Sequence, residues 1–384
     1  MKQKISVMVV DDSALMRRMI SDMINMESDI EVTGTAKNGQ DLLDKLKAGQ
    51  VPDVVTLDVE MPTMNGIEAL KRIIREKIPT KVIMLSSLTK DGAETTMECL
   101  NIGAIDFVPK PSGSISLNIN TVRENLVEKI RESYMSRSRT VSRRPTFSAE
   151  FKERMNAHKS GVAVNGEELA KEIRSSINVS EVKKTRHIIP AGAGKISAVV
   201  IGASTGGPKA LYEVITTLSG NLDVPVLVVQ HMPEGFTKAF SDRLNRFSKL
   251  TVVEAAEGMK VENGVVYIAP GGKHMTVIDK KIRLNLEPTI WGVRPAVDKL
   301  FESAVKEYGK QLLGVVLTGM GRDGADGIVK IKQAGGYTMS EDESTCVIYG
   351  MPKAAYETNM VDEVVPLYDV STRIGDIVLG EGRK

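Results

Sequence analysis

The sequence predicts an α/β protein with two doubly wound parallel-sheet domains joined by a linker. The chain has 384 residues, which is long for one domain and suits two globular units. Short, continuously apolar runs alternate with amphipathic segments in both halves, a pattern typical of buried parallel strands covered by helices on both faces. Between the halves this alternation weakens. We therefore expect a first domain over residues 1–135, a linker over 136–193 and a second domain over 194–384.

The first domain is expected to contain five strands separated by helices. The predicted strands are Ile5–Val10, Ile30–Ala36, Val54–Leu57, Lys81–Leu85 and Ile105–Val108. The segments with helical spacing are Ala14–Met26, Gln40–Lys47, Gly66–Glu76, Gly92–Asn101 and Thr121–Tyr134. This strict alternation predicts a parallel sheet.

The segment between the two domains is basic and contains serine. Lys and Arg outnumber Asp and Glu there, notably in Arg137–Arg139, Ser142–Pro145 and Lys183–Arg186. Such a composition is typical of a solvated, partly ordered linker. A docking arm for an acidic partner is the alternative.

The second domain begins near Lys195 and is again expected to be a mostly parallel sheet, with no internal repeat. The predicted strands are Ser197–Ile201, Val226–Gln230, Thr251–Glu254, Val265–Ala269, Leu313–Thr318 and, with a weaker pattern, Cys346–Tyr349. The predicted helices are Gly206–Leu218, Thr237–Phe247, Pro295–Tyr308 and Gly324–Ala334.

The composition favours a cytoplasmic protein. No apolar run reaches the roughly 18 residues of a membrane span, and the first residues lead directly into a strand instead of resembling a secretory signal. Cys99 and Cys346 are far apart and lack metal-ligand spacing, so we expect both to be reduced. A net charge of +2 gives no general argument for nucleic acid binding. We therefore expect neither membrane insertion nor a nucleic acid partner.

Polar residues mark the carboxyl ends of several strands in the first domain. Asp11 and Asp12 end the first strand, Asp58 the third and Ser86 the fourth, while Lys110 follows the fifth. In a parallel sheet these ends share one edge, where ligands collect. Clustered carboxylates need a hard cation such as Mg²⁺ to stay ionised, and a carboxylate can accept a phosphoryl group. Lys110 could neutralise the added charge, and Ser86 could hydrogen-bond a phosphoryl oxygen.

These residues resemble the signature of a response-regulator receiver domain. The resemblance covers residues 4–125 and rests on Val9–Ser13, Leu57–Gly66, Ser86–Ser87 and Pro109–Pro111. It implies a flavodoxin-like fold, with Asp58 as the phosphoacceptor and with Asp11 and Asp12 holding Mg²⁺ together with Asp58. It also implies three phospho-switch residues, Ser86, Phe107 and Lys110, and a candidate cis peptide at Lys110–Pro111.

A glycine-rich turn opens the second domain, in Ile201–Lys209. Pro208 stands where a phosphate-binding loop requires lysine, and the dinucleotide fingerprint G-x-G-x-x-G is also absent. The remaining interpretation is a nucleophile turn, in which glycines give clearance around Ser204. Like G-x-S-x-G, it places a serine in a turn beside glycines, but the sequence does not match that motif.

A serine nucleophile needs a base, and the chain has four histidines. His158 and His187 fall in the linker. His231 ends the strongest strand of this half, at the same sheet edge as Ser204, and is preferred to His274.

The third group of such a site should be an acid at another strand end. Asp323 fits, and the glycine-flanked backbone around it could form an oxyanion hole. Asp326 and Asp298 are competitors that we expect on or near helices. Zinc held by His231, His274 and an acid stays possible, although no zinc motif supports it.

With these residues assembled, residues ~195–384 resemble the catalytic domain of the CheB family of chemotaxis protein-glutamate methylesterases. The matching stretches are Gly202–Gly207, Gln230–Thr237, Ile268–Gly271, Arg294–Asp298, Thr318–Gly324 and Tyr349–Pro352. The resemblance implies a Rossmann-like esterase domain whose triad is Ser204, His231 and Asp323. The Met320 N–H falls at the family's oxyanion position, and Thr205 lies beside the nucleophile. The long basic linker departs from the family pattern.

The two resemblances together imply a phosphorylation-activated enzyme. It would hydrolyse glutamate γ-methyl esters on membrane-bound chemoreceptors, release methanol and also deamidate receptor glutamines. A chemotaxis histidine kinase would be the phosphodonor, Mg²⁺ would serve the receiver domain, and the esterase would need no cofactor. The unphosphorylated receiver would cover the triad. A DNA-binding output and a non-catalytic, phospho-regulated binding output are the alternatives.

Overall fold

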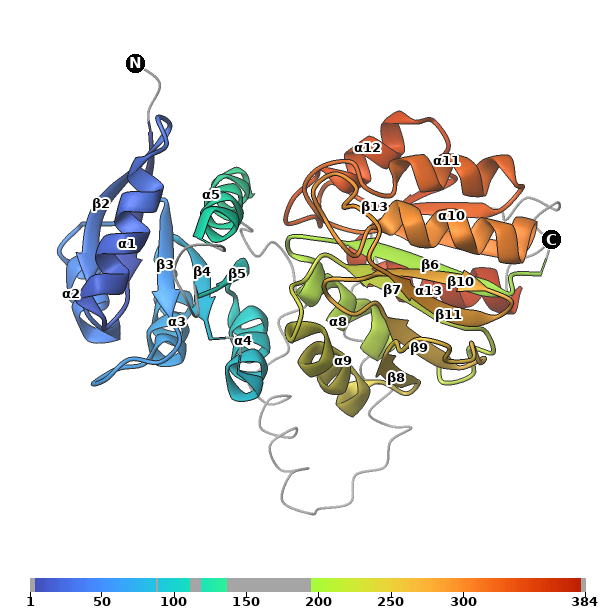
Figure 1. Cartoon of the computed structure of the whole chain (residues 1–384), viewed down its shortest axis with the longest axis horizontal. Coiled ribbons are helices and arrows are strands. Elements are labelled where there is room, and N and C mark those ends of the chain that lie inside the picture. The colour runs from blue at the N-terminus through green and yellow to red at the C-terminus, as the bar shows by residue number, and fades with distance from the viewer. Residues whose placement is uncertain (1–3, 88, 111–118, 137–194, 381–384) are drawn as a thin grey trace, which may run out of the picture. The chain divides into compact units, whose positions relative to one another are not determined.

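The computed structural model describes residues 4–87, 89–110, 119–136 and 195–380, and these contain two main sheets (Figure 1). The Lys110–Pro111 peptide and nearly all of the expected linker lie outside the described residues. The two-sheet α/β fold class is confirmed, because every pairing inside both sheets is parallel.

The first sheet has five strands in the order β2-β1-β3-β4-β5, the flavodoxin-like order. Its strands are β1 (Ile5–Val10), β2 (Ile30–Ala36), β3 (Val54–Asp58), β4 (Lys81–Ser86) and β5 (Asp106–Pro109). Each lies within two residues of its predicted bounds, because short apolar runs between turns specify buried strands well.

Helices cover both faces of this sheet. They are α1 (Ala14–Asn25), α2 (Gly39–Lys47), α3 (Gly66–Arg75), α4 (Lys90–Ile102) and α5 (Ile119–Met135). Helices α1 and α5 pack on one face, through residues such as Ile24 and Ile130. Helices α2, α3 and α4 pack on the other, through residues such as Leu43 and Leu70. The acidic strand ends are thus the part of the sheet that helices leave open.

The second sheet has seven strands in the order β14-β13-β12-β6-β7-β9-β8. Its strands are β6 (Ala198–Ala203), β7 (Val226–Gln230), β8 (Thr251–Glu254), β9 (Val265–Ile268), β12 (Leu312–Val316), β13 (Tyr337–Glu341) and β14 (Glu363–Val365). Its helices are α8 (Gly207–Thr217), α9 (Phe236–Phe247), α10 (Val297–Tyr308), α11 (Ala325–Gln333), α12 (Met351–Glu357) and α13 (Leu367–Leu379), with a short 3-10 turn at Gly309–Gln311. Strands β7, β9 and β8 lie on one side of β6, and β12, β13 and β14 lie on the other. The strand order therefore reverses at β6, and ligands bind at such switch points in parallel sheets.

Several elements of the second half differ from the sequence prediction. The predicted strand Cys346–Tyr349 is wrong: this segment is an irregular bend with one isolated bridge, between Gly319 and Tyr349. An antiparallel hairpin, β10 (His274–Ile278) with β11 (Lys281–Asn285), was not predicted, and neither were β13, β14, α12 and α13. Strand β13 escaped prediction because three of its five residues are polar, although all five are buried.

No helix among the described residues is long and apolar enough to cross a membrane.

Gly66, the first residue of α3, packs against the strand that carries Asp58. A Cβ there would lie 2.0 Å from the backbone oxygen of Asp58. We expect Gly66→Ala to lower the free energy of unfolding of the first domain by about 1–3 kcal/mol, because the new methyl group would displace the backbone at Asp58. Urea unfolding measures this change. Gly375→Ala is the matched control, since a Cβ at this helical position would meet nothing within 4 Å. It should stabilise by about 0.5–1 kcal/mol, and equal effects of the two changes would contradict the steric argument.

Candidate functional site

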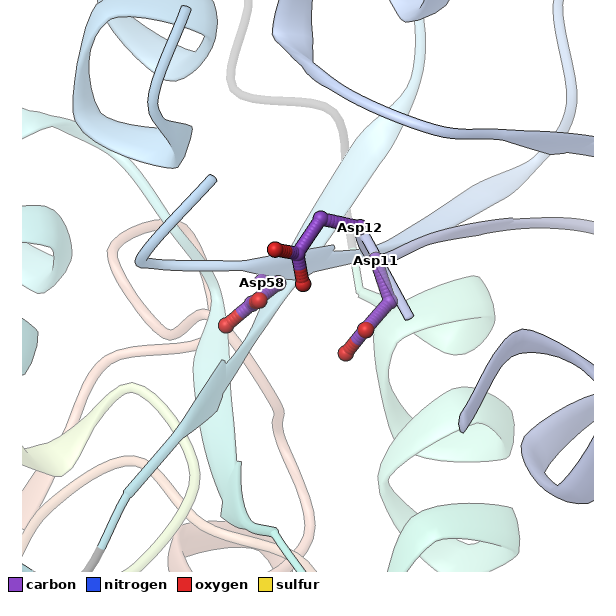
Figure 2. Close-up of side chains that lie close together, drawn as sticks. All are labelled: Asp11, Asp12 and Asp58. Atoms are coloured by element: carbon purple, nitrogen blue, oxygen red, sulfur yellow. The ribbon is translucent and has the colours of Figure 1, made fainter. Parts of the chain in front are cut away.

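The open edge of the first sheet gathers three carboxylates, which we call the acidic edge: Asp11, Asp12 and Asp58. Asp11 and Asp12 follow β1 and Asp58 ends β3, so parallel pairing brings them together (Figure 2). One oxygen of each lies within 4.8 Å of the others. Within the described part of the chain, no other group of three histidine, cysteine or acidic side chains comes this close. Oxygen donors at this spacing fit a hard cation such as Mg²⁺.

Lys110 compensates part of the negative charge at the acidic edge. Its Nζ lies 2.9 Å from Asp11 Oδ2 and 2.7 Å from Asp58 Oδ2. Burial raises the pKa of Asp58 to about 6, and the charge of Asp11 adds to this effect while Lys110 opposes it. Burial also disfavours the charged form of Lys110, but the hydrogen bonds with Asp58 and Asp11 outweigh it and raise the lysine pKa. The site therefore holds more negative charge than its one lysine neutralises.

Two further residues of the predicted switch set lie on neighbouring strands. Ser86 ends β4, and its hydroxyl accepts from Thr96 Oγ1 at 2.6 Å and donates to the Gly92 carbonyl at 3.1 Å, both on α4. Phe107 is buried in β5, and its ring centroid lies 4.4 Å from that of Phe236, at the start of α9. Ser86 thus contacts α4, and Phe107 contacts the start of α9.

At the second sheet, Ser204 sits in the turn between β6 and α8. The Ser204 N–H donates to the Thr318 carbonyl at 3.0 Å, and the Gln230 amide donates to the Ser204 carbonyl at 3.0 Å. Gly206 has a φ of 78° and leaves no room for a side chain, because a Cβ would lie 2.5 Å from Val347. These contacts hold the backbone at the serine, and the crowding by Val347 together with the positive φ explains why glycine occupies position 206.

His231 and Asp323 form a direct pair beside this turn. Asp323 Oδ2 lies 2.8 Å from His231 Nε2 and also accepts from the Val297 N–H at 2.6 Å. Its other oxygen accepts from the Asp298 N–H at 2.9 Å. Burial opposes ionisation, but the hydrogen bond and charge of His231 and these two N–H groups hold the pKa of Asp323 below its ordinary value. His231 and the N-terminus of α10 together thus favour the ionised form of this acid.

The ring orientation of His231 differs from the usual serine triad. There the acid binds Nδ1 and the serine faces Nε2. Here Asp323 binds Nε2, which leaves Nδ1 as the nitrogen that can accept a proton.

The segment that leads from β12 to Asp323 is held from several sides. The Thr318 N–H donates to the buried Glu341 carboxylate at 2.8 Å, and Thr318 Oγ1 donates to the Thr205 carbonyl at 3.0 Å. The Met351 N–H donates to the Gly319 carbonyl at 2.8 Å. These bonds orient the backbone that leads into Met320. Sequence reasoning missed Glu341, since it lies in the unpredicted strand β13.

The competing residues have structural partners. His274 is buried between the Pro288 carbonyl, 3.0 Å from Nε2, and the Ala296 N–H, 3.2 Å from Nδ1. Burial lowers its pKa and so favours the neutral imidazole. Asp326 pairs with Arg322 at the surface, at 3.0 Å. Asp298 accepts from the Gly327 N–H at 2.7 Å. The zinc alternative finds no support, because among the described residues the only close group of potential ligands is the acidic edge.

Thr205 contacts a buried charged cluster on α5. Its Oγ1 accepts from Lys129 Nζ at 2.7 Å and donates to the Glu132 carboxylate. Lys129 also pairs with Asp106 of β5 at 2.9 Å. Burial disfavours the charged lysine, but the charges of Asp106 and Glu132 outweigh it and raise the pKa of Lys129. The sequence held no signal for this cluster, because α5 showed only a helical pattern.

Replacing Asp58 should stabilise the protein in the absence of divalent cations. Its folded-state pKa of about 6 lies above the ordinary value of 3.8, so ionisation costs stability as the pH rises through this range. We expect Asp58→Asn to raise the free energy of unfolding at pH 8 by up to about 3 kcal/mol. The gain should fade toward pH 4 and shrink when Mg²⁺ is added. Urea unfolding in EDTA measures it, and a variant no more stable than wild type at pH 8 would contradict the electrostatic account.

Comparison with known proteins gives two domain matches. Residues 199–374 match the CheB methylesterase family, and residues 7–120 match the response regulator receiver domain.

Full-length relatives cover both domains. A protein of Clostridium acetobutylicum named protein-glutamate methylesterase/protein-glutamine glutaminase is 50% identical, over 98% of this chain and 99% of its own. A protein of Bacillus subtilis with the same name is 42% identical, over 98% and 99% of the two chains. Among solved structures, the Thermotoga maritima CheB methylesterase catalytic domain is 43% identical and matches 47% of this chain and 98% of its own, with a TM-score of 0.45.

Proposed function

This chain belongs to the CheB family of protein-glutamate methylesterases, and we propose that it hydrolyses glutamate γ-methyl esters on chemoreceptors under the control of phosphorylation at Asp58. The observation that supports the chemistry most directly is the pair of His231 and Asp323, joined at 2.8 Å beside the Ser204 turn. Such a pair is what a serine hydroxyl needs to become a nucleophile.

In the proposed reaction, Ser204 Oγ attacks the ester carbonyl while His231 Nδ1 takes its proton. Asp323 stabilises the imidazolium that forms. The tetrahedral intermediate collapses, its C–O bond to the methoxy group breaks, and His231 returns the proton so that methanol leaves. Water then attacks the acyl-enzyme: His231 takes a proton from the water and returns it to Ser204 Oγ as the acyl–oxygen bond breaks, and the freed carboxylic acid loses its proton to solvent to give glutamate. Each step conserves atoms and charge without a cofactor.

The Met320 N–H is the proposed oxyanion donor. Hydrogen bonds hold its neighbours Thr318 and Gly319, so the donor is oriented before the reaction begins. One such donor contributes about 2.7–4 kcal/mol in comparable sites. A glutamine side chain presents the same acyl carbon with ammonia as leaving group, so the proposal includes deamidation, in line with the relatives' names.

At the acidic edge, Asp58 is the proposed phosphoacceptor, with a histidine kinase as phosphodonor. Asp11, Asp12 and Asp58 would hold Mg²⁺, since their oxygens lie within 4.8 Å of one another. The bound ion would offset negative charge on the carboxylates and on an incoming phosphoryl group. Lys110, already paired with Asp58 and Asp11, would pair with the added phosphoryl charge.

The proposed control works by releasing Thr205, the residue next to the nucleophile. In the structure described here, Thr205 is bound to Lys129 and Glu132 of α5. Phe107, two residues before the end of β5, contacts Phe236 of α9. Phosphorylation replaces the single negative charge of the Asp58 carboxylate with the roughly 1.5 to 2 negative charges of a phosphoryl group near Lys110, which follows β5 directly. A shift of β5 and its neighbours would weaken both contacts and open the serine site.

We predict that Ser204→Ala abolishes methanol release from methyl-labelled receptor membranes. Asp323→Asn should lower kcat by about 10⁴-fold, because it loses the charge that orients and stabilises His231. Asp326→Asn is the control, since Asp326 pairs with Arg322 at the surface, and it should keep wild-type kcat. Wild-type release by Ser204→Ala would exclude the esterase assignment and favour a non-catalytic binding output.

A second prediction concerns the switch. A small phosphodonor with Mg²⁺ should raise methanol release by wild type and leave Asp58→Asn unchanged. Lys129→Gln should raise release several-fold without the donor, because Thr205 loses a charged partner. Arg131→Gln is the matched control on α5, since Arg131 pairs with Glu27 and Asp29 instead. Unaltered basal release in Lys129→Gln would count against the Thr205 contact as the restraint.

A further inference from the structure

Trp291, the only tryptophan of the chain, is held at the surface in an unusual backbone conformation. With Gly292 it forms the two-residue turn of a tight hairpin, closed by hydrogen bonds of 3.0 and 3.2 Å between Ile290 and Val293. Its φ of 53° is rare for a bulky residue, because the Cβ crowds the backbone. The side chain is nevertheless 55% exposed, so core packing does not explain the turn.

Two contacts join this ring to the acid of the serine site. Arg322 Cζ lies 5.1 Å from the centroid of the indole ring, and Arg322 directly precedes Asp323. Burial and the charge of Asp323 raise the pKa of Asp298 to about 6, and a hydrogen bond from Trp291 opposes this rise. The Asp298 N–H in turn donates to Asp323 at 2.9 Å. The ring therefore lies beside the segment that carries Asp323, and more than half of the residue stays open to solvent.

Arg322 is available to a partner. Its ion pair with Asp326, at 3.0 Å, joins side chains that are 54% and 53% exposed. An exposed pair of this kind contributes at most about 1 kcal/mol, so a carboxylate from another molecule can replace Asp326 at little cost. Tryptophan and arginine are also the residue types that most often dominate binding energy at interfaces.

We propose that Trp291 and Arg322 form the contact surface for the polypeptide that flanks the esterified glutamate, and that they set affinity for the protein substrate. This inference rests on the proposed function. A polypeptide with several modifiable glutamates carries free carboxylates once some esters are hydrolysed, and these complement the guanidinium of Arg322. The indole face packs against the aliphatic parts of side chains in the polypeptide that flanks the esterified glutamate. Neither residue takes part in breaking the ester bond.

The test compares a protein substrate with a small one. For Trp291→Ala and Arg322→Ala, we expect the KM for methylated receptor membranes to rise about tenfold each while kcat stays within about twofold of wild type. Hydrolysis of p-nitrophenyl acetate, which has no flanking polypeptide, should not change, and this also shows that the variants fold. Arg322→Lys should recover part of the lost affinity. Tyr368→Ala, which removes a similarly exposed ring from α13, should behave as wild type.

The outcomes separate this inference from the function on which it rests. Wild-type release by Ser204→Ala would overturn the proposed function. Loss of release in Ser204→Ala together with a wild-type KM in Trp291→Ala and Arg322→Ala would overturn the contact surface alone. An equal loss of activity toward both substrates would also overturn it, because the residues would then act by positioning Asp323.

Fluorescence gives a second readout that does not depend on turnover. Because Trp291 is the only tryptophan, its emission in the Ser204→Ala variant reports on this surface directly. Adding a purified receptor fragment that lacks tryptophan should shift the emission saturably, and Arg322→Glu should abolish the shift. Emission that does not respond to the fragment contradicts the proposal.

Discussion

Parallel strand pairing is the constraint on which both sites depend. All strands of a parallel sheet end at one edge, so residues far apart in the sequence meet there without any loop reaching across the molecule. Asp11 and Asp58 come together because β1 pairs with β3, and the Ser204 turn lies beside His231 because β6 pairs with β7 and the His231 N–H donates to the Ala203 carbonyl at 3.1 Å. Asp323 joins the latter two because β12 pairs with β6 on its other side. The proposed reactive groups thus owe their positions to backbone hydrogen bonds in the sheets.

Burial alone does not decide what these acids can do. Asp58 and Asp323 are almost equally buried, yet burial raises the pKa of Asp58 to about 6 while that of Asp323 lies below its ordinary value. The difference lies in their partners. Asp58 shares one lysine with a second carboxylate and accepts one backbone N–H, from Glu60 at 3.3 Å, whereas Asp323 receives two backbone N–H groups and an imidazole. An unsatisfied acid suits a group that awaits a cation or a phosphoryl group, and a satisfied acid suits one that must stay ionised beside its base.

The site residues that lie at strand ends could be predicted from the sequence. The contacts that depend on tertiary packing could not. Acids, serine and histidine at the ends of apolar runs could be placed at two sheet edges, because periodicity identifies those runs. The partners of Thr205 could not be placed, because Lys129 and Glu132 lie on a helix whose pattern shows only that it is amphipathic. Strand β13 was missed because its polar residues are satisfied internally, as Glu341 is by the Thr318 N–H and the Thr345 hydroxyl. The turn at Trp291 was missed because a tryptophan gives no sequence signal for a positive φ.

The contacts around Lys129 connect the proposed phosphorylation site at Asp58 to Thr205 through only a few residues. Lys110, which pairs with Asp58, directly follows β5, and Asp106 begins that strand. Asp106 pairs with Lys129, and Lys129 donates to Thr205, the neighbour of the proposed nucleophile. Lys129 is also the only cation that these contacts supply to Asp106, Glu132 and Thr205, so a displacement of β5 that weakens one pair alters the balance of the others. Buried ion pairs tolerate such a change poorly, since a charge that loses its partner away from water costs several kcal/mol. A small movement at the acidic edge can therefore have a large effect on the hydroxyl beside Ser204, and no long-range rearrangement of either sheet is required.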